Sequence, residues 1–126
     1  MLLLNKKEII LKVYGIKTCS SVKKALKFLK ENSIDYEFID LKKEPVDCKK
    51  IDLWIEKAGI DKLFNNRGTK YRTLKLKELN LDSSGKREWL CKENLLIKRP
   101  VIELDNGELI VAFDEDEYQK LFTVKM

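Results

Sequence analysis

The chain has 126 residues, of which 44% are hydrophobic and 37% are charged, and this length suits one domain with one core. No apolar run approaches the length of a membrane span, and "NKKE" interrupts the leucines at the start before a signal-peptide core could form. We therefore expect a single cytoplasmic domain over residues 1–126 with no membrane partner.

The formal net charge is +5, and the lysines are spread along the whole chain. Basic character permits weak attraction to nucleic acids, membrane surfaces or small anions, but it does not choose among them. A solvated lysine-rich face explains the charge without any such partner. We expect no specific nucleic-acid binding, and from size and surface charge we expect a monomer.

The chain contains three cysteines, Cys19, Cys48 and Cys91, and no histidine. The odd count and wide spacing argue against a disulfide framework. The absence of histidine excludes Cys–His and Ser–His–Asp catalysis and most structural zinc sites, so we predict no metal. Helix ends, lysines and arginines must therefore activate any reactive cysteine.

The first part of the chain predicts a βαβ unit. Residues 9–15, "IILKVYG", are β-branched and apolar and predict a buried strand. Helical spacing of apolar residues follows over 19–32, and "DYEFIDL" at 35–41 alternates as a second strand does. This order implies a parallel pair of strands with a right-handed crossover.

The middle of the chain predicts helices and no strand. Helical spacing covers 48–59, with Gly59 as the stop, and 83–95. Between them we expect a helical turn at 60–66, a polar loop at 67–74 and a short helix at 75–81.

Strands return at the end of the chain. The apolar runs 99–105 and 108–113 flank "DNG", which favours a hairpin, and a helix is expected over 114–122. The whole order predicts an α/β fold, a thioredoxin-like mixed four-stranded sheet with a helical insertion between its second and third strands. The core would comprise about 9–44 and 99–122, and the insertion about 45–98.

Cys19 lies where the first helix begins, three residues after the "GI" that ends the first strand. Unbonded backbone N–H groups and the positive end of the helix dipole favour a thiolate there, and Lys17 could add to the effect. The alternative is a small buried residue at a helix start that is capped by Thr18, Ser20 or Ser21. For Cys91 packing is favoured, and for Cys48 partial exposure.

Two arginines and a proline could complete a site around Cys19. Pro100 begins a strand that this architecture places opposite the first helix start, so we predict a cis bond after Arg99, although a trans strand-initiating proline is commoner. Arg67 lies in a glycine-containing loop and could bind an oxyanion through two parallel hydrogen bonds. A surface arginine in a polar loop is the alternative.

The stretches "VYGIKTCSSVKKALKFL", "LFNNRGTKYRTL" and "LIKRPVIELDNGELIVAFDEDEY" resemble the ArsC/Spx family of arsenate reductase-like proteins, most closely its YffB-type branch. The resemblance implies Cys19 as nucleophile, and Arg67 and Arg99 as anion-binding residues. In the family's arsenate reductases the cysteine attacks arsenate, and glutathione with glutaredoxin completes the reduction.

Two positions depart from the family patterns. Where arsenate reductases carry a third arginine, this chain has Ala112 or Phe113, followed by acids that would repel an arsenate dianion. Where Spx regulators carry the second cysteine of a CxxC switch, this chain has Val22, so a dithiol switch at that site is excluded.

A family member whose thiol site has decayed is one possibility, which the presence of Cys19, Arg67, Arg99 and Pro100 together makes less favoured. Beside it, two functions remain open. The first is a monothiol oxidoreductase that uses Cys19 on a disulfide or an arsenate-like oxyanion. Its co-substrate would be glutathione, or a glutaredoxin or thioredoxin partner. The second is an Spx-like regulator that binds the C-terminal domain of the RNA polymerase α subunit without turnover.

Overall fold

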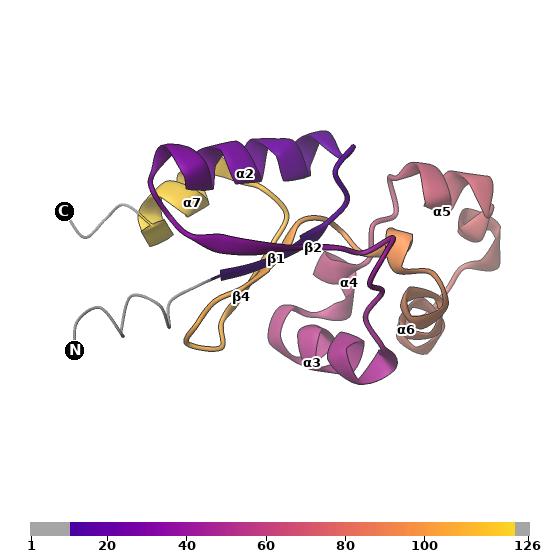
Figure 1. Ribbon diagram of the computed structural model, residues 1–126. Helices are drawn as coiled ribbons and strands as arrows, with labels where there is room; N and C mark the ends of the chain where they lie inside the picture. The colour runs from indigo at the N-terminus through magenta and orange to yellow at the C-terminus, as the bar shows by residue number, and fades with distance from the viewer. Residues whose placement is uncertain (1–10, 123–126) are drawn as a thin grey trace. The chain divides into compact units, whose positions relative to one another are not determined.

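The computed structural model describes residues 11–122. The leucines near the start and the first two residues of the predicted strand at 9–15 lie outside the described residues. The chain divides into two compact units (Figure 1). We call residues 11–39 and 99–122 the sheet unit, and residues 40–98 the helical unit.

The sheet unit contains a mixed four-stranded sheet in the order β2-β1-β3-β4. Its strands are β1 (Leu11–Gly15), β2 (Tyr36–Asp40), β3 (Val101–Glu103) and β4 (Leu109–Val111). Antiparallel pairing joins β1 to β3 and β3 to β4. The connection from β1 to β2 passes through helix α2 (Ser20–Glu31), as a parallel pair requires.

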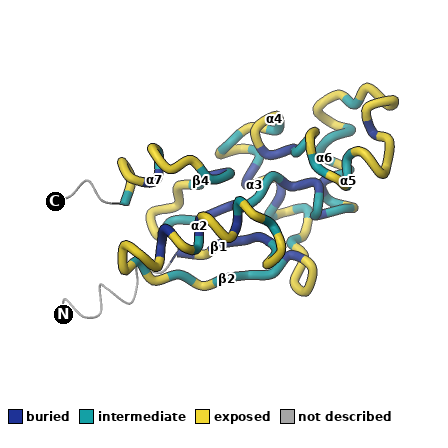
Figure 2. The backbone as a smooth tube through the Cα atoms, turned by 90° about the horizontal axis from the view of Figure 1, so that it is seen from above, coloured by how far each residue is buried: buried dark blue, intermediate teal, exposed yellow. Residues whose placement is uncertain are grey.

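Helices α2 and α7 (Glu115–Phe122) cover one face of the sheet (Figure 1). On that face Val13 pairs with Ile102, and Ile102 pairs with Ile110, so one apolar row crosses three strands. Buried and exposed residues alternate along α2 (Figure 2), and its buried residues are Val22, Ala25, Phe28 and Leu29. The resulting core fixes both helices on the sheet.

The order β-α-β followed by β-β-α is that of a thioredoxin-like fold, and the helical unit separates its two halves in sequence. This confirms the fold class expected from the sequence. Each strand and helix of the sheet unit lies within or at the edges of its predicted range, because apolar periodicity and turn residues mark all of them.

The helical unit consists of helices that pack on one another, α3 with α6 and α4 with both. Its elements are α3 (Cys48–Ala58), α4 (Ile60–Leu63), α5 (Thr69–Thr73), α6 (Ser83–Lys92) and the 3₁₀ turns η1 (Leu76–Leu79) and η2 (Asn94–Leu96). Asp47 caps α3 by accepting from Lys50 N at 3.0 Å, and Asp82 caps α6 by accepting from Gly85 N at 2.8 Å.

Two sequence predictions in the helical unit are wrong. The loop expected at 67–74 contains α5, whose Tyr71 ring meets Phe64 edge-on at 5.9 Å. The helix expected over 83–95 ends at Lys92 and is followed by η2. In both places tertiary contacts decide the structure, because the local sequence has no apolar periodicity to reveal it.

The odd number and wide spacing of the cysteines argue against a disulfide framework, but one disulfide is present. Cys48 and Cys91 are bonded to each other within the helical unit, and both are half-buried. They lie 43 residues apart in sequence, and only the packing of α3 against α6 brings them together. Cys19 is the free cysteine.

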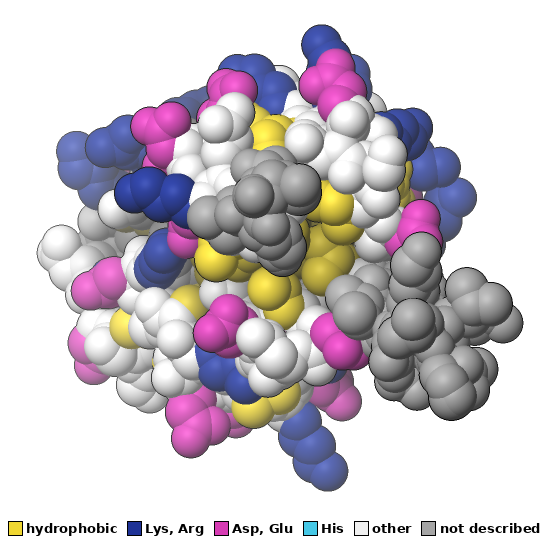
Figure 3. Space-filling view, turned by 90° about the vertical axis from the view of Figure 1, so that its left-hand side faces the viewer, with side chains coloured by type: hydrophobic (Ala, Val, Ile, Leu, Met, Phe, Trp, Pro, Cys, Tyr) yellow, Lys and Arg dark blue, Asp and Glu magenta, His cyan; other side chains and the backbone are white. Residues whose placement is uncertain are grey.

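The surface carries both signs of charge. Figure 3 shows a face on which Lys, Arg, Asp and Glu side chains surround hydrophobic ones near its middle. None of the helices within residues 11–122 has the length and apolarity that crossing a bilayer demands.

Candidate active site

Cys19 is the N-cap residue of α2 and has an extended backbone, with φ −79° and ψ 126°. Its carbonyl accepts the first bond of the helix from Lys23 N at 3.0 Å, while its side chain makes no capping hydrogen bond. The thiol is half-buried and bonded to no other sulfur. The sulfur therefore stands at the positive end of a 12-residue helix and is not used in capping it.

A close contact between β1 and α2 fixes this helix start. A Cβ atom on Gly15 would lie 2.6 Å from Val22 Cγ2, so only glycine lets the strand end approach the first turn of α2. Val22 itself is fully buried. Residue 22 therefore faces the interior, so the position that would hold a second cysteine is a packing position here.

Pro100 lies in the sheet unit near the start of α2. The Arg99–Pro100 peptide bond is cis, and Pro100 is buried at the start of β3. Tyr14 pairs with Val101, so one further step of the antiparallel register places Pro100 beside Gly15, where β1 leads into the Cys19 turn. Arg99 is half-buried next to it, and its Nε atom is inaccessible to solvent.

Lys17 lies in the turn that carries the chain from β1 to α2. The turn is closed by a hydrogen bond from Cys19 N to Ile16 O at 3.3 Å, and Lys17 is exposed within it. Its ammonium group is therefore two residues from the thiol in sequence and open to solvent.

The residues after β4 are bonded to the start of β3. Ala112, which with Phe113 is one of the two residues expected at the position of the third arginine, donates from N to Pro100 O at 2.8 Å. Asp114 follows and caps α7 by accepting from Glu117 N at 3.1 Å. The end of β4 therefore carries Ala112 and Phe113, neither of which is a cation, and an acid follows them.

Arg67 belongs to the helical unit and lies in the loop between α4 and α5. Its amide donates to Asn65 Oδ1 at 3.0 Å, and its carbonyl accepts from Arg72 Nη1 at 2.7 Å. Arg72 Nη2 also reaches Thr69 Oγ1 at 3.4 Å. These bonds hold the backbone of the loop from both sides and leave the Arg67 side chain exposed.

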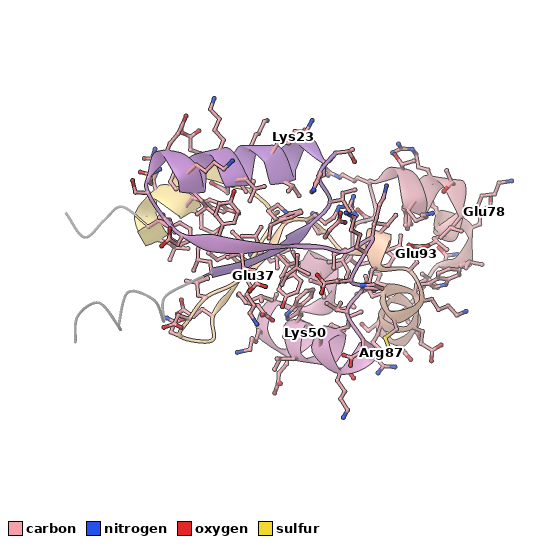
Figure 4. All side chains as sticks on the ribbon, in the orientation of Figure 1. Lys23, Glu37, Lys50, Glu78, Arg87 and Glu93 are labelled. Carbon is pink, nitrogen blue, oxygen red and sulfur yellow. A yellow bond between two sulfur atoms is a disulfide. The ribbon has the colours of Figure 1, made fainter. Side chains whose placement is uncertain are left out.

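A groove of about 500 Å³ adjoins the loop. The charged side chains that line it are Arg67, Arg72, Lys75, Lys77 and Glu78, the last of which is labelled in Figure 4. Four cations face one acid, so the groove favours an anionic group. The roles of Asn65 and Arg72 were not predicted from the sequence, although both stand in the "NNRGTKYR" stretch that contains Arg67.

The sheet unit thus holds Lys17, Cys19, Arg99 and Pro100, and the helical unit holds Arg67. That the five residues act at one site remains a prediction. Within residues 11–122, no three His, Cys, Asp or Glu side chains gather closely enough to hold a metal ion.

The chain matches the ArsC family over residues 14–121. An uncharacterized protein of Haemophilus influenzae is 38% identical over 87% of this chain and 96% of its own length. The global transcriptional regulator Spx of Lactiplantibacillus plantarum is 25% identical over 90% of this chain and 87% of its own.

Solved structures are similar over most of the chain as well. The YffB protein is 32% identical, with a TM-score of 0.81 over 90% of this chain and 99% of its own. An arsenate reductase (ArsC) related protein of Brucella melitensis is 35% identical, with a TM-score of 0.72 over 91% of this chain and 96% of its own.

Proposed function

Since the chain belongs to the ArsC family, we propose that it is a monothiol oxidoreductase with Cys19 as its nucleophile. One observation carries the proposal. Cys19 is a free, half-buried cysteine at the N-terminus of α2, and its side chain makes no capping bond. A thiolate placed there can accept hydrogen bonds from the unbonded N–H groups of the first turn.

The reaction is a pair of thiol–disulfide exchanges. The Cys19 thiolate attacks one sulfur of a disulfide, forms a mixed disulfide and releases the other sulfur as a thiolate. The thiolate of glutathione then attacks the substrate sulfur of this mixed disulfide. Cys19 leaves as a thiolate, and the substrate sulfur ends in a disulfide with glutathione. A second glutathione thiolate then attacks the glutathione sulfur of that disulfide, releases the substrate as a thiolate and forms glutathione disulfide. Each step forms one S–S bond and breaks one.

The cationic side chains would bind the anionic parts of the reactants. Arg99 precedes Pro100, which the β1–β3 register places beside the strand that leads to Cys19, and its guanidinium would stabilise the thiolate and hold a carboxylate. Arg67, in its fixed loop, would hold a second carboxylate or an oxyanion, and Lys17 would assist as an exposed charge.

Glutathione fits these requirements better than arsenate does. It carries two carboxylates at opposite ends of a thiol-bearing peptide, which two arginines can bind. The site lacks a third arginine, and Asp114 to Glu117 follow Ala112 closely in sequence. An arsenate dianion would meet like charges there. We therefore propose a glutathione-dependent thiol/disulfide reductase.

The proposal is tested by the rate at which a small alkylating reagent modifies Cys19 at neutral pH. The variants Arg67→Ala and Arg99→Ala should each slow the reaction, because each removes a positive charge that stabilises the thiolate. Lys24→Ala is the matched control, since Lys24 is an exposed cation on the same helix.

Turnover is measured in parallel as glutathione-dependent reduction of a small mixed disulfide. Cys19→Ser should abolish it, and Lys24→Ala should retain it. A wild-type alkylation rate no faster than that of a small free thiol, and unchanged by either arginine substitution, would remove Cys19 from the chemistry.

An Spx-like regulatory role is the second candidate function. It is favoured by the similarity to the transcriptional regulator Spx, which extends over nearly the whole of this chain. The family resemblance makes the C-terminal domain of the RNA polymerase α subunit the expected partner. Val22 is buried at the position of the second switch cysteine, so such a regulator would act without a dithiol switch at α2.

A binding experiment separates the two functions. The purified C-terminal domain of the RNA polymerase α subunit is tested against the chain at micromolar concentration, with and without Cys19→Ser. Binding that persists in Cys19→Ser, together with no glutathione-dependent turnover, would favour the regulator. Absence of binding together with turnover would favour the enzyme.

A further inference from the structure

The disulfide of the helical unit joins the first residue of α3 to the last turn of α6. Cys48 and Cys91 have Cα atoms 5.2 Å apart, within the range that a disulfide spans. Both residues are half-buried, and neither takes part in the site proposed for Cys19. The bond therefore needs its own explanation.

A salt bridge ties the same two helices one turn further along. Arg87 Nε donates to Asp52 Oδ1 at 2.9 Å, and Arg87 Nη2 donates to Asp52 Oδ2 at 2.9 Å (Arg87 is labelled in Figure 4). Asp52 lies four residues after Cys48, and Arg87 lies four residues before Cys91. The helices thus run antiparallel, with a covalent link at one turn and a two-bond ion pair at the next.

This arrangement favours re-formation of the disulfide after it has been reduced. When the S–S bond is reduced, the Asp52–Arg87 pair and the packing of α3 on α6 still hold the two thiols opposite each other. The thiols then have a high effective concentration for one another, and a mild oxidant such as glutathione disulfide can close the bond again.

The two sulfurs differ in their electrostatic surroundings. Cys48 is at the positive end of α3, whereas Cys91 is in the last turn of α6, where the helix dipole is negative. The neighbouring Asp47 carboxylate is engaged with Lys50 N as the cap of α3. Cys48 is therefore the better leaving group, and an incoming thiolate should attack the sulfur of Cys91.

We propose that Cys48 and Cys91 form a second, reversible thiol–disulfide centre that exchanges with small thiols of the glutathione class. A thiolate attacks Cys91 Sγ, breaks the S–S bond and releases Cys48 as a thiolate, which takes a proton. A second thiolate attacks the reductant's sulfur in the mixed disulfide, releases Cys91 and forms the oxidised reductant. Two electrons pass to the protein, and two thiols become one disulfide. This centre does not depend on the function proposed for Cys19.

The test uses the full chain with Cys19→Ser, which removes the other thiol. The protein is equilibrated in buffers of varied ratio of glutathione to glutathione disulfide, quenched with acid and alkylated, and its free thiols are counted by mass. We expect the number of free thiols to rise from none to two as the ratio increases, with a minor species at intermediate ratios that has one free thiol and glutathione bound at Cys91. Two free thiols at every ratio, or none at any ratio, would overturn the proposal.

A second measurement tests the role of the salt bridge. Arg87→Gln in the same background should shift the transition roughly two- to fivefold toward the reduced form, because an exposed ion pair contributes modestly to holding the thiols together. Lys62→Gln is the matched control, since it removes one exposed cation of the helical unit. Circular dichroism first checks that each variant is folded. Equal midpoints for Arg87→Gln and Lys62→Gln would overturn the proposed basis of reversibility.

Discussion

Ala112 holds a backbone conformation that residues with side chains adopt rarely, with φ +74°. Two hydrogen bonds impose it. Ala112 N donates to Pro100 O at 2.8 Å, and Tyr118 Oη donates to Ala112 O at 3.1 Å. Because both backbone groups are engaged, the residue cannot relax without losing a bond to Pro100 or to α7.

Replacing Ala112 with glycine should therefore stabilise the protein. The left-handed conformation strains alanine sterically but does not strain glycine. The greater freedom of glycine in the unfolded chain offsets part of the stability gained. We expect Ala112→Gly to raise the free energy of unfolding by about 0.5 kcal/mol, measured by chemical denaturation. Ala58→Gly, in helix α3, is the control and should lower it. A loss of stability in Ala112→Gly would contradict the strain.

Tyr118 is fully buried, and its hydroxyl donates to the Ala112 carbonyl. Tyr118→Phe leaves that carbonyl without this donor, so the free energy of unfolding should fall by about 1 kcal/mol near neutral pH, as measured by chemical denaturation. The ring contacts with Phe28 and Phe113 are retained in the variant, which separates the hydrogen bond from packing. Unchanged stability in Tyr118→Phe would show that the hydrogen bond contributes nothing.

The same substitution has a pH dependence whose sign follows from the burial of the ring. Burial raises the pKa of Tyr118 above its ordinary value of about 10. The stability that follows from this shift is fully present below pH 10 and is lost as the pH rises from there toward the folded-state pKa. The advantage of wild type over Tyr118→Phe should therefore shrink as the pH is raised from about 9 to about 11. An advantage that stays constant across this range would contradict the raised pKa.

At the scale of elements, the sequence predicts those whose apolar residues repeat with a helix or strand period. Strand β1 and helix α2 are of this kind, and so the place of Cys19 at the helix start could be predicted from Gly15 and the periodicity that follows. Helix α5 could not be predicted in this way, because its five residues show no apolar periodicity, although Tyr71 within it packs on Phe64. The Cys48–Cys91 bond could not be predicted from the sequence either, since it depends on the pairing of two helices that are distant in sequence.

Helix α6 depends on its cap because it begins with Ser83, Ser84 and Gly85, which favour a helix little. Asp82 Oδ1 accepts the Gly85 N–H at 2.8 Å. Asp82→Ala should lower the free energy of unfolding by about 1 kcal/mol, measured by chemical denaturation. Asp82→Asn keeps an oxygen acceptor and should retain most of the stability. If the asparagine variant were as unstable as the alanine variant, the charge at the helix start, and not the hydrogen bond, would be the cause.

At the scale of the whole molecule, the proposed site draws on both units. Cys19 and Arg99 belong to the sheet unit, where the β1–β3 register pairs the strand that leads to Cys19 with the strand that follows Arg99, and Arg67 belongs to the helical unit. Sequence motifs single out all three residues as candidates, but they could not reveal that Arg72 and Asn65 hold the Arg67 loop. The contribution proposed for Arg67 is therefore the step of the proposal that requires the whole chain.

A double-substitution experiment tests this contribution. Arg67→Ala should slow the reaction of Cys19 with glutathione disulfide about tenfold, the effect of losing one charge-assisted hydrogen bond to a carboxylate. Arg72→Gln should slow it less, because it frees the loop that presents Arg67. The double variant should be no slower than Arg67→Ala alone, since Arg72 acts through Arg67.

Lys75→Gln removes a cation from the same groove without touching the loop bonds and should react at the wild-type rate. Additive effects of the two arginine substitutions, or equal effects of Arg72→Gln and Lys75→Gln, would show that the groove acts on the thiol only through its overall charge.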